Sequence, residues 1–252
     1  MLKSFLVSLI LSITITPLFP NSFRADTLTH NNGNRFKPTQ LIVPTALIAY
    51  GAMGLSKGFV QDINGSINAV VTERGRVTTS IDEYLKYTPI VAVYALNALG
   101  VEGRNRFWDR SILVVSSYVI MGATVNGLKL ISNVERPNGE DFKSFPSGHT
   151  AISFMAAEFL WQEYSDESVW YGVAGYMVAA SVGTMRILRQ KHWLTDVAAG
   201  AGFGILSTKV AYWVYPWAKR RLLRCTKKSE LELSLLPVYN SSQMGAGLWM
   251  RF

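Results

Sequence analysis

Apolar stretches alternate with short polar stretches along most of this chain. The stretch 111–131 is long enough to cross a bilayer core of roughly 30 Å as a helix. We find no internal repeat and no alternation of strands with helices that would indicate a parallel sheet. The pattern therefore predicts an all-α integral membrane helical bundle of about five to six core helices. The apolar stretches are residues 41–55, 87–101, 111–131, 150–161, 169–185 and 197–217.

The segments around these stretches indicate the domain organisation. Gly, Ala and Ser are frequent in the last two apolar stretches, as close helix packing within a membrane requires. Residues 61–86 are mixed in character and are predicted as an amphipathic helix and a loop outside the membrane. We predict one membrane-embedded domain over residues 41–228. The tail, residues 229–252, alternates weakly and contains the turn sequence "NSSQMG", which favours a small β-hairpin.

The N-terminal segment has the pattern of an export signal. Residues 1–25 contain Lys3 near the start, then an apolar run, then small and polar residues, which favours a signal peptide over an uncleaved anchor helix. Residues 26–40 are polar and turn-rich and are predicted as a linker. A full span over residues 41–60 would start in the cytoplasm, which disagrees with a cleaved signal. Either that stretch enters the membrane only partway, or the first apolar run is retained as a helix.

Composition agrees with a membrane location and an anionic partner. Apolar residues make up 49% of the chain, charged residues only 17%, and the formal net charge is +8. This balance suits membrane lipids or an acidic substrate, whereas no basic stripe with interleaved aromatic residues indicates nucleic acid. The single cysteine, Cys225, excludes an intrachain disulfide and a cysteine-rich zinc site.

The basic sequence "KRRLLRCTKK" (219–228) follows the last apolar stretch and indicates that this end is cytoplasmic. One span earlier, the residues around His192 and Asp196 then face the periplasm. The expected location is the bacterial inner membrane, with several spans and the polar helix ends on the periplasmic side.

Three polar islands, "KLISNVERP", "SFPSGHTA" and "RILRQKHWLTD", interrupt the apolar helices. With the topology above, all three lie at helix ends on the same side. Ionisable groups at membrane depth are costly and are usually functional. The islands supply the candidate site residues Lys129, Arg136, Ser147, Gly148, His149, Arg186, His192 and Asp196.

These residue types suit the binding and cleavage of a phosphate ester. Lysine and arginine side chains can converge on one dianion, and the turn before a helix offers backbone N–H groups to the same anion. His192 and Asp196 are four residues apart on the expected first turn of a helix, so they share a face. The carboxylate can hold one imidazole nitrogen and leave the other free to attack. His149 is placed to protonate a leaving alkoxide.

Each residue also has a purely structural interpretation. His149 could cap a helix, and Lys129 and Arg136 could be interfacial anchors. Arg186 could pair with Asp196. Arg189 lies outside the motif positions and is expected, with Lys191, in a solvated loop.

Taken together, the islands closely resemble the signature of the type 2 phosphatidic acid phosphatase (PAP2) superfamily, K-x6-R-P, P-S-G-H and S-R-x5-H-x3-D. The resemblance covers roughly residues 85–217, and one position departs from it, because Met185 stands where the family has Ser. It implies that His192 forms a phosphohistidine, Asp196 orients it and His149 transfers the proton. It also implies that no metal or other cofactor is needed, because cations and neutral donors hold the phosphate oxygens. These donors are Lys129, Arg136, Ser147, Gly148 and Arg186.

The resemblance implies a membrane phosphatase acting on a lipid phosphate monoester or diphosphate. Helix ends at headgroup level favour a lipid substrate, either lipid A phosphate or undecaprenyl diphosphate, followed by phosphatidylglycerol phosphate or phosphatidate. Two alternatives remain open at this point: a haloperoxidase-like relative that binds vanadate, and a non-catalytic lipid-binding protein with the same bundle.

Overall fold

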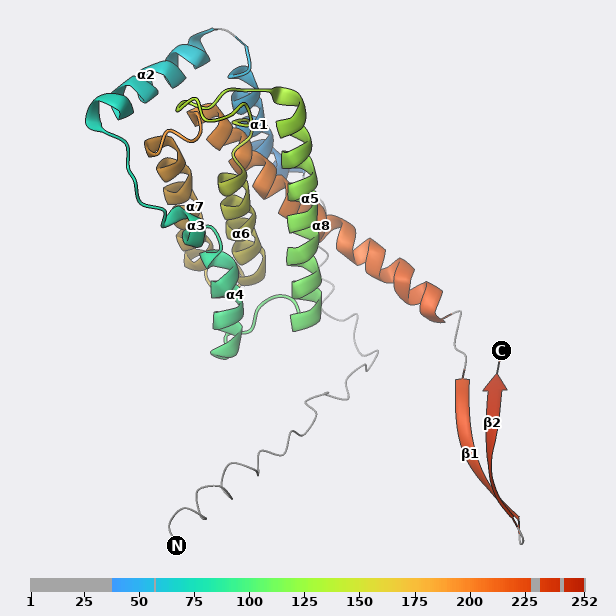
Figure 1. Cartoon of the computed structure of the whole chain (residues 1–252). Helices are drawn as coiled ribbons and strands as arrows, with labels where there is room; N and C mark the ends of the chain where they lie inside the picture. Colours follow the sequence, from blue (N-terminus) through green and yellow to red (C-terminus); the bar gives the residue numbers. More distant parts are fainter. Residues whose placement is uncertain (1–37, 57, 228–231, 241–242, 252) are drawn as a thin grey trace, which may run out of the picture. The chain divides into compact units, whose positions relative to one another are not determined.

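The computed structural model describes residues 38–56, 58–227, 232–240 and 243–251 (Figure 1). The predicted signal peptide over residues 1–25, and most of the linker predicted over residues 26–40, lie outside the described residues. Helices form on each apolar stretch that the sequence pattern marked, which confirms the all-α bundle. They are η1 (Pro38–Leu41), α1 (Ile42–Met53), α2 (Phe59–Arg74), α3 (Asp82–Leu85), α4 (Thr88–Ala98), α5 (Phe107–Ser132), α6 (Gly148–Tyr164), α7 (Val169–Leu188) and α8 (Leu194–Lys227).

Helix α6 is the central element of the bundle. It packs against α4, α5, α7 and α8, and Ala151, Met155 and Phe159 along it are completely buried. Small residues let the neighbouring helices approach. A Cβ atom at Gly200 of α8 would lie 2.5 Å from the carbonyl oxygen of Ser147, so no side chain fits there. The start of α8 is therefore held tightly against the start of α6.

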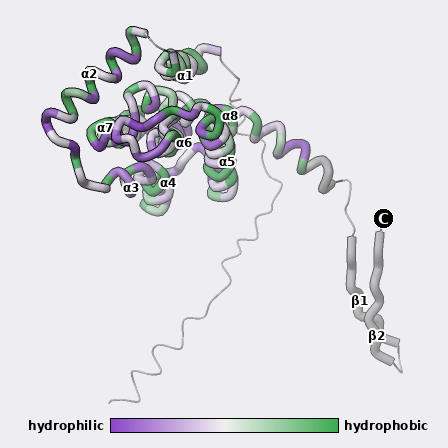
Figure 2. Tube along the Cα trace, turned by 45° about the horizontal axis from the view of Figure 1, so that its top comes forward, coloured by the Kyte–Doolittle hydropathy of each residue, from purple (hydrophilic) through white to green (hydrophobic). Residues whose placement is uncertain are grey.

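Helix α5 and residues Leu194–Leu222 of α8 are long and apolar enough to cross a membrane. Val115 and Val119 of α5 are 60% and 62% exposed, and such a continuous apolar face is stable against lipid rather than water. These features support a membrane protein. Figure 2 shows a different character for α2, in which hydrophobic and hydrophilic turns alternate.

The segment between α1 and α4 packs over the starts and ends of the helices that carry the polar islands. The amide of Asn64 on α2 donates to the Thr195 hydroxyl of α8 at 2.8 Å. The backbone N–H of Val77 donates to the carbonyl oxygen of Leu188 at the end of α7, at 3.1 Å. This segment then forms the short helix α3, which contacts both α6 and α7.

Helix α8 continues through Pro216 to Lys227, beyond the predicted apolar stretch. The strands β1 (Glu232–Asn240) and β2 (Gln243–Arg251) follow and pair antiparallel, from Glu232 opposite Arg251 to Asn240 opposite Gln243. This is the small C-terminal hairpin that the alternation in the tail favoured.

Candidate active site

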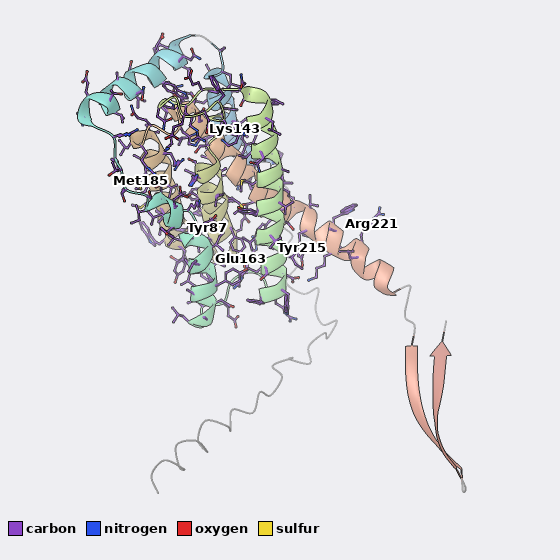
Figure 3. All side chains as sticks on the ribbon, viewed as in Figure 1. Tyr87, Lys143, Glu163, Met185, Tyr215 and Arg221 are labelled. Atoms are coloured by element: carbon purple, nitrogen blue, oxygen red, sulfur yellow. The ribbon has the colours of Figure 1, made fainter. Side chains whose placement is uncertain are left out.

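The three polar islands meet at one end of the helical bundle. Lys129 is in the last turn of α5 and Arg186 in the last turn of α7, whereas His149 and Asp196 are in the first turns of α6 and α8. The loop between α5 and α6, which contains Lys143 (Figure 3), closes the same end.

His192 lies between a carboxylate and a guanidinium group. Its Nδ1 is 3.6 Å from Oδ2 of Asp196, and its Nε2 is 3.4 Å from Nη1 of Arg136. The side chain is only 2% exposed. Burial lowers the pKa of His192 to about 4, although Asp196 opposes this shift. His192 is therefore neutral near pH 7, with a lone pair available on one ring nitrogen.

Two groups fix the Asp196 carboxylate. The hydroxyl of Ser144 donates to Oδ2 at 2.5 Å, and the backbone N–H of Trp193 donates to the same atom at 2.9 Å. The contact from Trp193 caps the start of α8. It explains why α8 begins at Leu194, so that His192 lies just before the helix and not in its first turn as expected.

Sequence reasoning missed Ser144. Its side chain is fully buried, and its hydroxyl also lies 3.5 Å from Nδ1 of His192. Its position in the "SFPSGHTA" island was the only signal available in the sequence.

Arg136 and Lys129 are held by the loops around the site. The guanidinium of Arg136 donates from Nε to Asp141 at 2.7 Å and from Nη1 to the carbonyl oxygen of Lys191 at 3.0 Å. The ammonium group of Lys129 donates to the carbonyl oxygen of Lys143 at 2.6 Å. Lys129 is close enough to Arg136 and Arg186 to experience repulsion from both. An anion bound among these cations would relieve this repulsion.

Some hydrogen-bonding groups of the turn at Ser147 already have partners within the protein. The Ser147 hydroxyl is 2.9 Å from the Thr150 hydroxyl, and its backbone N–H donates to the carbonyl oxygen of Asp196 at 3.0 Å. Within the described part of the chain, no side chain caps the start of α6. Gly148 has the Lys129 side chain beside it: a Cβ on this glycine would lie 3.9 Å from Cε of Lys129. The uncapped first turn of α6 thus faces a cation and suits an anion.

Arg186 pairs with Asp82 and not with Asp196, the partner considered in the structural interpretation. Its Nη1 donates to Oδ2 of Asp82 at 2.8 Å, and the side chain is 6% exposed. Among the described residues, its buried Nε has no hydrogen-bond partner. A buried unpaired donor is costly, and a phosphate oxygen would satisfy it.

Arg189 also binds Asp82, at 2.6 Å, and its side chain is only 15% exposed. The expectation of a solvated Arg189 is therefore wrong, because the carboxylate of α3 lies over this loop. Lys191 pairs with Glu140 at 2.5 Å, at a partly exposed position.

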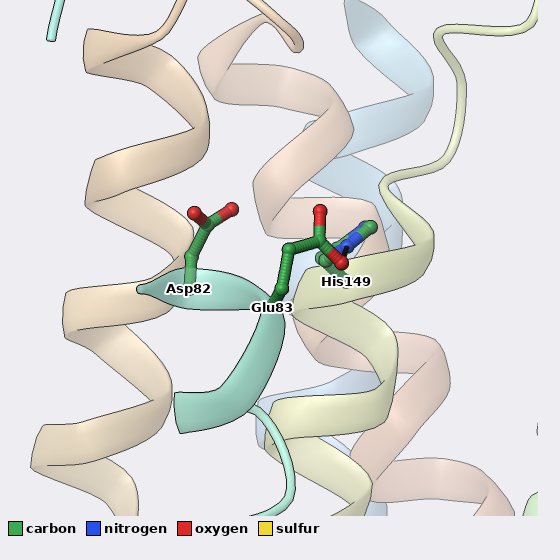
Figure 4. Close-up of side chains that lie close together, drawn as sticks. All are labelled: Asp82, Glu83 and His149. Carbon is green, nitrogen blue, oxygen red and sulfur yellow. Dashed lines mark hydrogen bonds and ion pairs between the residues drawn. The ribbon is translucent and has the colours of Figure 1, made fainter. Parts of the chain in front are cut away.

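The acidic pair Asp82 and Glu83 on α3 is the main feature that sequence reasoning missed. Oε2 of Glu83 is 2.7 Å from Nε2 of His149. Figure 4 shows the Glu83 side chain beside the His149 ring. Burial alone would raise the pKa of Asp82, but Arg186 and Arg189 outweigh this effect and hold the pKa below its ordinary value. The two carboxylates were visible in the sequence only as a short acidic pair between apolar stretches.

Asp82, Glu83 and His149 could in principle hold a metal ion, since their possible ligand atoms lie within 4.8 Å of one another. However, Arg186 and Arg189 both bind Asp82, so a cation there would face two guanidinium groups. Arg186 and Arg189 already neutralise Asp82, so the surroundings of this cluster do not favour a metal ion.

Parts of this chain are similar in sequence to known proteins. A lipid A 1-phosphatase from Porphyromonas gingivalis is 37% identical over 144 residues, which are 57% of this chain and 32% of that protein. The bacitracin transport permease protein BcrC from Bacillus licheniformis is 38% identical over 73 residues, which are 29% of this chain and 34% of that protein. This chain thus spans about a third of the length of these curated relatives.

Among solved structures, a transmembrane PAP2-type phosphatidylglycerolphosphate phosphatase from Bacillus subtilis is similar, with a TM-score of 0.47 and 18% identity. The similarity covers 71% of this chain and 97% of that one. The profile of the PAP2 superfamily matches residues 110–220, which include the three polar islands. Residues 110–220 of this chain are thus similar to the PAP2 superfamily, the family whose signature the three polar islands resemble.

Proposed function

We propose that this protein is a membrane phosphatase that hydrolyses a lipid phosphate monoester or diphosphate through a phosphohistidine on His192. The observation that carries the proposal is the placement of the His192 ring, with Nδ1 near Asp196 and Nε2 near Arg136. A neutral imidazole held in this way has its lone pair beside a cation that can bind the phosphate to be attacked.

In the first step, Nε2 of His192 attacks phosphorus and the bond from phosphorus to the lipid oxygen breaks. His149 donates its proton to that oxygen as it leaves. Asp196 stabilises the positive charge that develops on the His192 ring, and Ser144 and the Trp193 N–H keep the carboxylate in place.

In the second step, His149 takes a proton from water, and the resulting hydroxide attacks phosphorus. The bond between phosphorus and Nε2 breaks, its electron pair returns to the nitrogen, and inorganic phosphate leaves. His149 is protonated again at the end of the cycle.

In this proposal, groups of the protein alone stabilise the negative charge on the transferred phosphoryl group. Lys129, Arg136 and Arg186 bind the phosphate oxygens where negative charge develops, and the first turn of α6 adds the neutral donors of Ser147 and Gly148. The unpaired Nε of Arg186 supports this assignment. The reaction as written requires no metal or other cofactor.

We propose a lipid substrate because the site lies at the ends of apolar helices, where a headgroup meets the membrane surface. The lipid A 1-phosphatase relative supports lipid A phosphate as substrate, with undecaprenyl diphosphate as an equal choice and phosphatidylglycerol phosphate or phosphatidate next. The proposed phosphatase domain covers residues 41–228. Its proposed location is the bacterial inner membrane, multi-pass, with the site facing the periplasm.

The test is a phosphate-release assay with these four lipids in detergent micelles, comparing the wild type with His192→Ala. We expect release from at least one lipid and a loss of at least about a thousandfold in the variant. Thermal unfolding in detergent checks that the variant remains folded. A folded His192→Ala that releases phosphate at the wild-type rate would refute the mechanism, and a wild type inactive on all four lipids would refute the function.

A further inference from the structure

His149 and His192 have matching surroundings, although their partners come from different parts of the chain. His192 has the Asp196 carboxylate near Nδ1, whereas His149 has the Glu83 carboxylate 2.7 Å from Nε2. Among the described residues, none forms a hydrogen bond with Nδ1 of His149. The His149 side chain is 24% exposed, so the ring is not sealed within the protein.

We propose that Glu83 is a positioning residue that holds His149 by Nε2, so that Nδ1 faces the substrate and carries the transferred proton. The inference rests on the proposed phosphatase reaction and adds to it a residue outside residues 110–220, the segment that matches the PAP2 profile. Each histidine of the site then has its own carboxylate: Asp196 serves the nucleophile and Glu83 serves the acid.

The Glu83 carboxylate is anchored for this role. Its Oε2 also accepts from Nζ of Lys86 at 2.9 Å, and its Oε1 lies 3.8 Å from Nη1 of Arg186. The preceding residue, Asp82, is completely buried and is bound by Arg186 and Arg189. Asp82 holds α3 in place through Arg186 and Arg189. Glu83 could turn away from His149 only by losing its own contacts with Lys86 and Arg186. Figure 4 shows Glu83 directed from α3 toward His149, with Asp82 directed elsewhere.

The proton balance of both steps is simple with this arrangement. In the first step the proton on Nδ1 moves to the leaving lipid oxygen, while the N–H at Nε2 stays hydrogen-bonded to Glu83. In the second step Nδ1 accepts a proton from the attacking water. Glu83 remains ionised throughout, since the hydrogen bond from His149 lowers the pKa of Glu83 to about 2 and outweighs the opposing effect of burial.

The electrostatic surroundings of His149 favour its neutral form, and the Glu83 carboxylate opposes them. Burial lowers the pKa of His149, the hydrogen bond with Glu83 opposes this, and the cations Arg186 and Lys86 add to the lowering. Without Glu83, the pKa of His149 would be lower still, and less of the protonated form needed in the first step would be present. The charged groups around this ring are Asp82, Glu83 and Lys86 from the α3 segment and Arg186 from α7.

The experiment compares Glu83→Gln with the wild type on two phosphate monoesters in detergent micelles, an aryl phosphate with a good leaving group and an alkyl lipid phosphate with a poor one. Gln keeps the size and a hydrogen-bond acceptor but removes the charge. We expect about a tenfold to hundredfold loss of kcat on the lipid and a much smaller loss on the aryl ester, because only the poor leaving group needs the proton.

The pH profile is the second readout. We expect the alkaline limb of kcat/KM for the lipid to move to lower pH by about one unit or more in Glu83→Gln, because removal of the carboxylate lowers the pKa of His149. Glu73→Gln, which makes the same charge change at an exposed position on α2, should leave both readouts unchanged.

The outcomes separate this inference from the proposed function. An active wild type with equal losses on both substrates in Glu83→Gln, or with an unshifted pH profile, would overturn the role of Glu83 alone. An inactive wild type would overturn the phosphatase proposal instead. Should Glu83→Gln fail to fold, Glu83→Asp replaces it: a smaller loss that still depends on the leaving group supports the role, and a uniform loss overturns it.

Discussion

The two ends of α6 carry buried charges of the same kinds, with opposite consequences. At the end of α6 that contains Tyr164, Nε of Arg110 lies 3.0 Å from Glu163, and the two side chains are 1% and 0% exposed. Glu163 (Figure 3) also accepts from the Asn105 amide at 2.6 Å and from the Tyr212 hydroxyl at 2.5 Å. At the start of α6, by contrast, the side chains of Arg136 and His149 are 15% and 24% exposed.

This difference shows what distinguishes a site from a structural ion pair. Arg110 and Glu163 neutralise each other in a sealed environment, so no ligand can reach them. At the start of α6, Arg136 and Arg186 both repel Lys129, and the partly exposed side chains of Arg136 and His149 leave this end open to an anion. Buried ionisable groups alone would have marked both ends as candidates. Accessibility and the excess of positive charge separate them.

The largest expected effect is a loss of stability when the buried ion pair at the Tyr164 end of α6 is broken. Arg110→Ala leaves the Glu163 carboxylate buried without its cation, which costs about 3–5 kcal/mol. We expect a strong decrease of the thermal unfolding temperature in detergent, with activity lost only in proportion to the unfolded fraction.

The matched variant at the other end of α6 is Arg186→Ala. It should reduce kcat/KM by about a hundredfold to a thousandfold. The change in unfolding temperature should be smaller than in Arg110→Ala, because Arg189 still pairs with Asp82 when Arg186 is removed. If both variants reduced stability equally and left the activity of the folded fraction intact, the contrast between the two ends would be wrong.

The sequence predicted the features that depend on neighbouring residues and missed those that depend on contacts between distant segments. The helices were predictable because each depends on a local run of apolar residues. The site residues from Lys129 to Asp196 were recognisable from spacing within three short islands. Glu83 was not, because its contact with His149 joins residues 66 apart and depends on how the loop before α4 folds back over α6 and α7.

The buried pair of Arg110 and Glu163 could not be predicted from the sequence for the same reason. Each is an ordinary charged residue in its own helix, and neither position shows that the two form a buried pair. Arg189 was expected to be solvated because its partner, Asp82, is also remote in sequence. Tertiary contacts between distant segments decide the role of a charge, and hydropathy patterns do not contain them.

A change of pH should have an intermediate effect on stability, through the titration of His192 in the candidate site. The pKa of His192 is about 4 in the folded protein and near 6.5 when the chain is unfolded, so the unfolded state binds more protons between these values. Stability from this group is complete above about pH 6.5 and decreases as the pH falls toward 4, by about 2 kcal/mol at pH 5.

Unfolding in detergent at pH 7 and pH 5 measures this effect, with His192→Gln as the control. The difference between the two pH values should be smaller in the variant by about 2 kcal/mol. An identical pH dependence in both proteins would mean that His192 is already solvated and does not occupy the environment described for the nucleophile.

The smallest expected effect concerns two buried serines, one at the site and one within α6. The Ser144 hydroxyl donates to Asp196 at 2.5 Å, whereas the buried Ser153 hydroxyl has no partner among the described residues. Ser144→Ala removes one of two donors that fix Asp196, so kcat should fall about tenfold, equivalent to about 1.4 kcal/mol, without unfolding the protein. Ser153→Ala removes an unsatisfied hydroxyl and should leave kcat unchanged, with stability equal or slightly higher. Equal effects of the two substitutions on kcat would show that the Ser144 contact does not orient the carboxylate, because only one of these hydroxyls reaches Asp196.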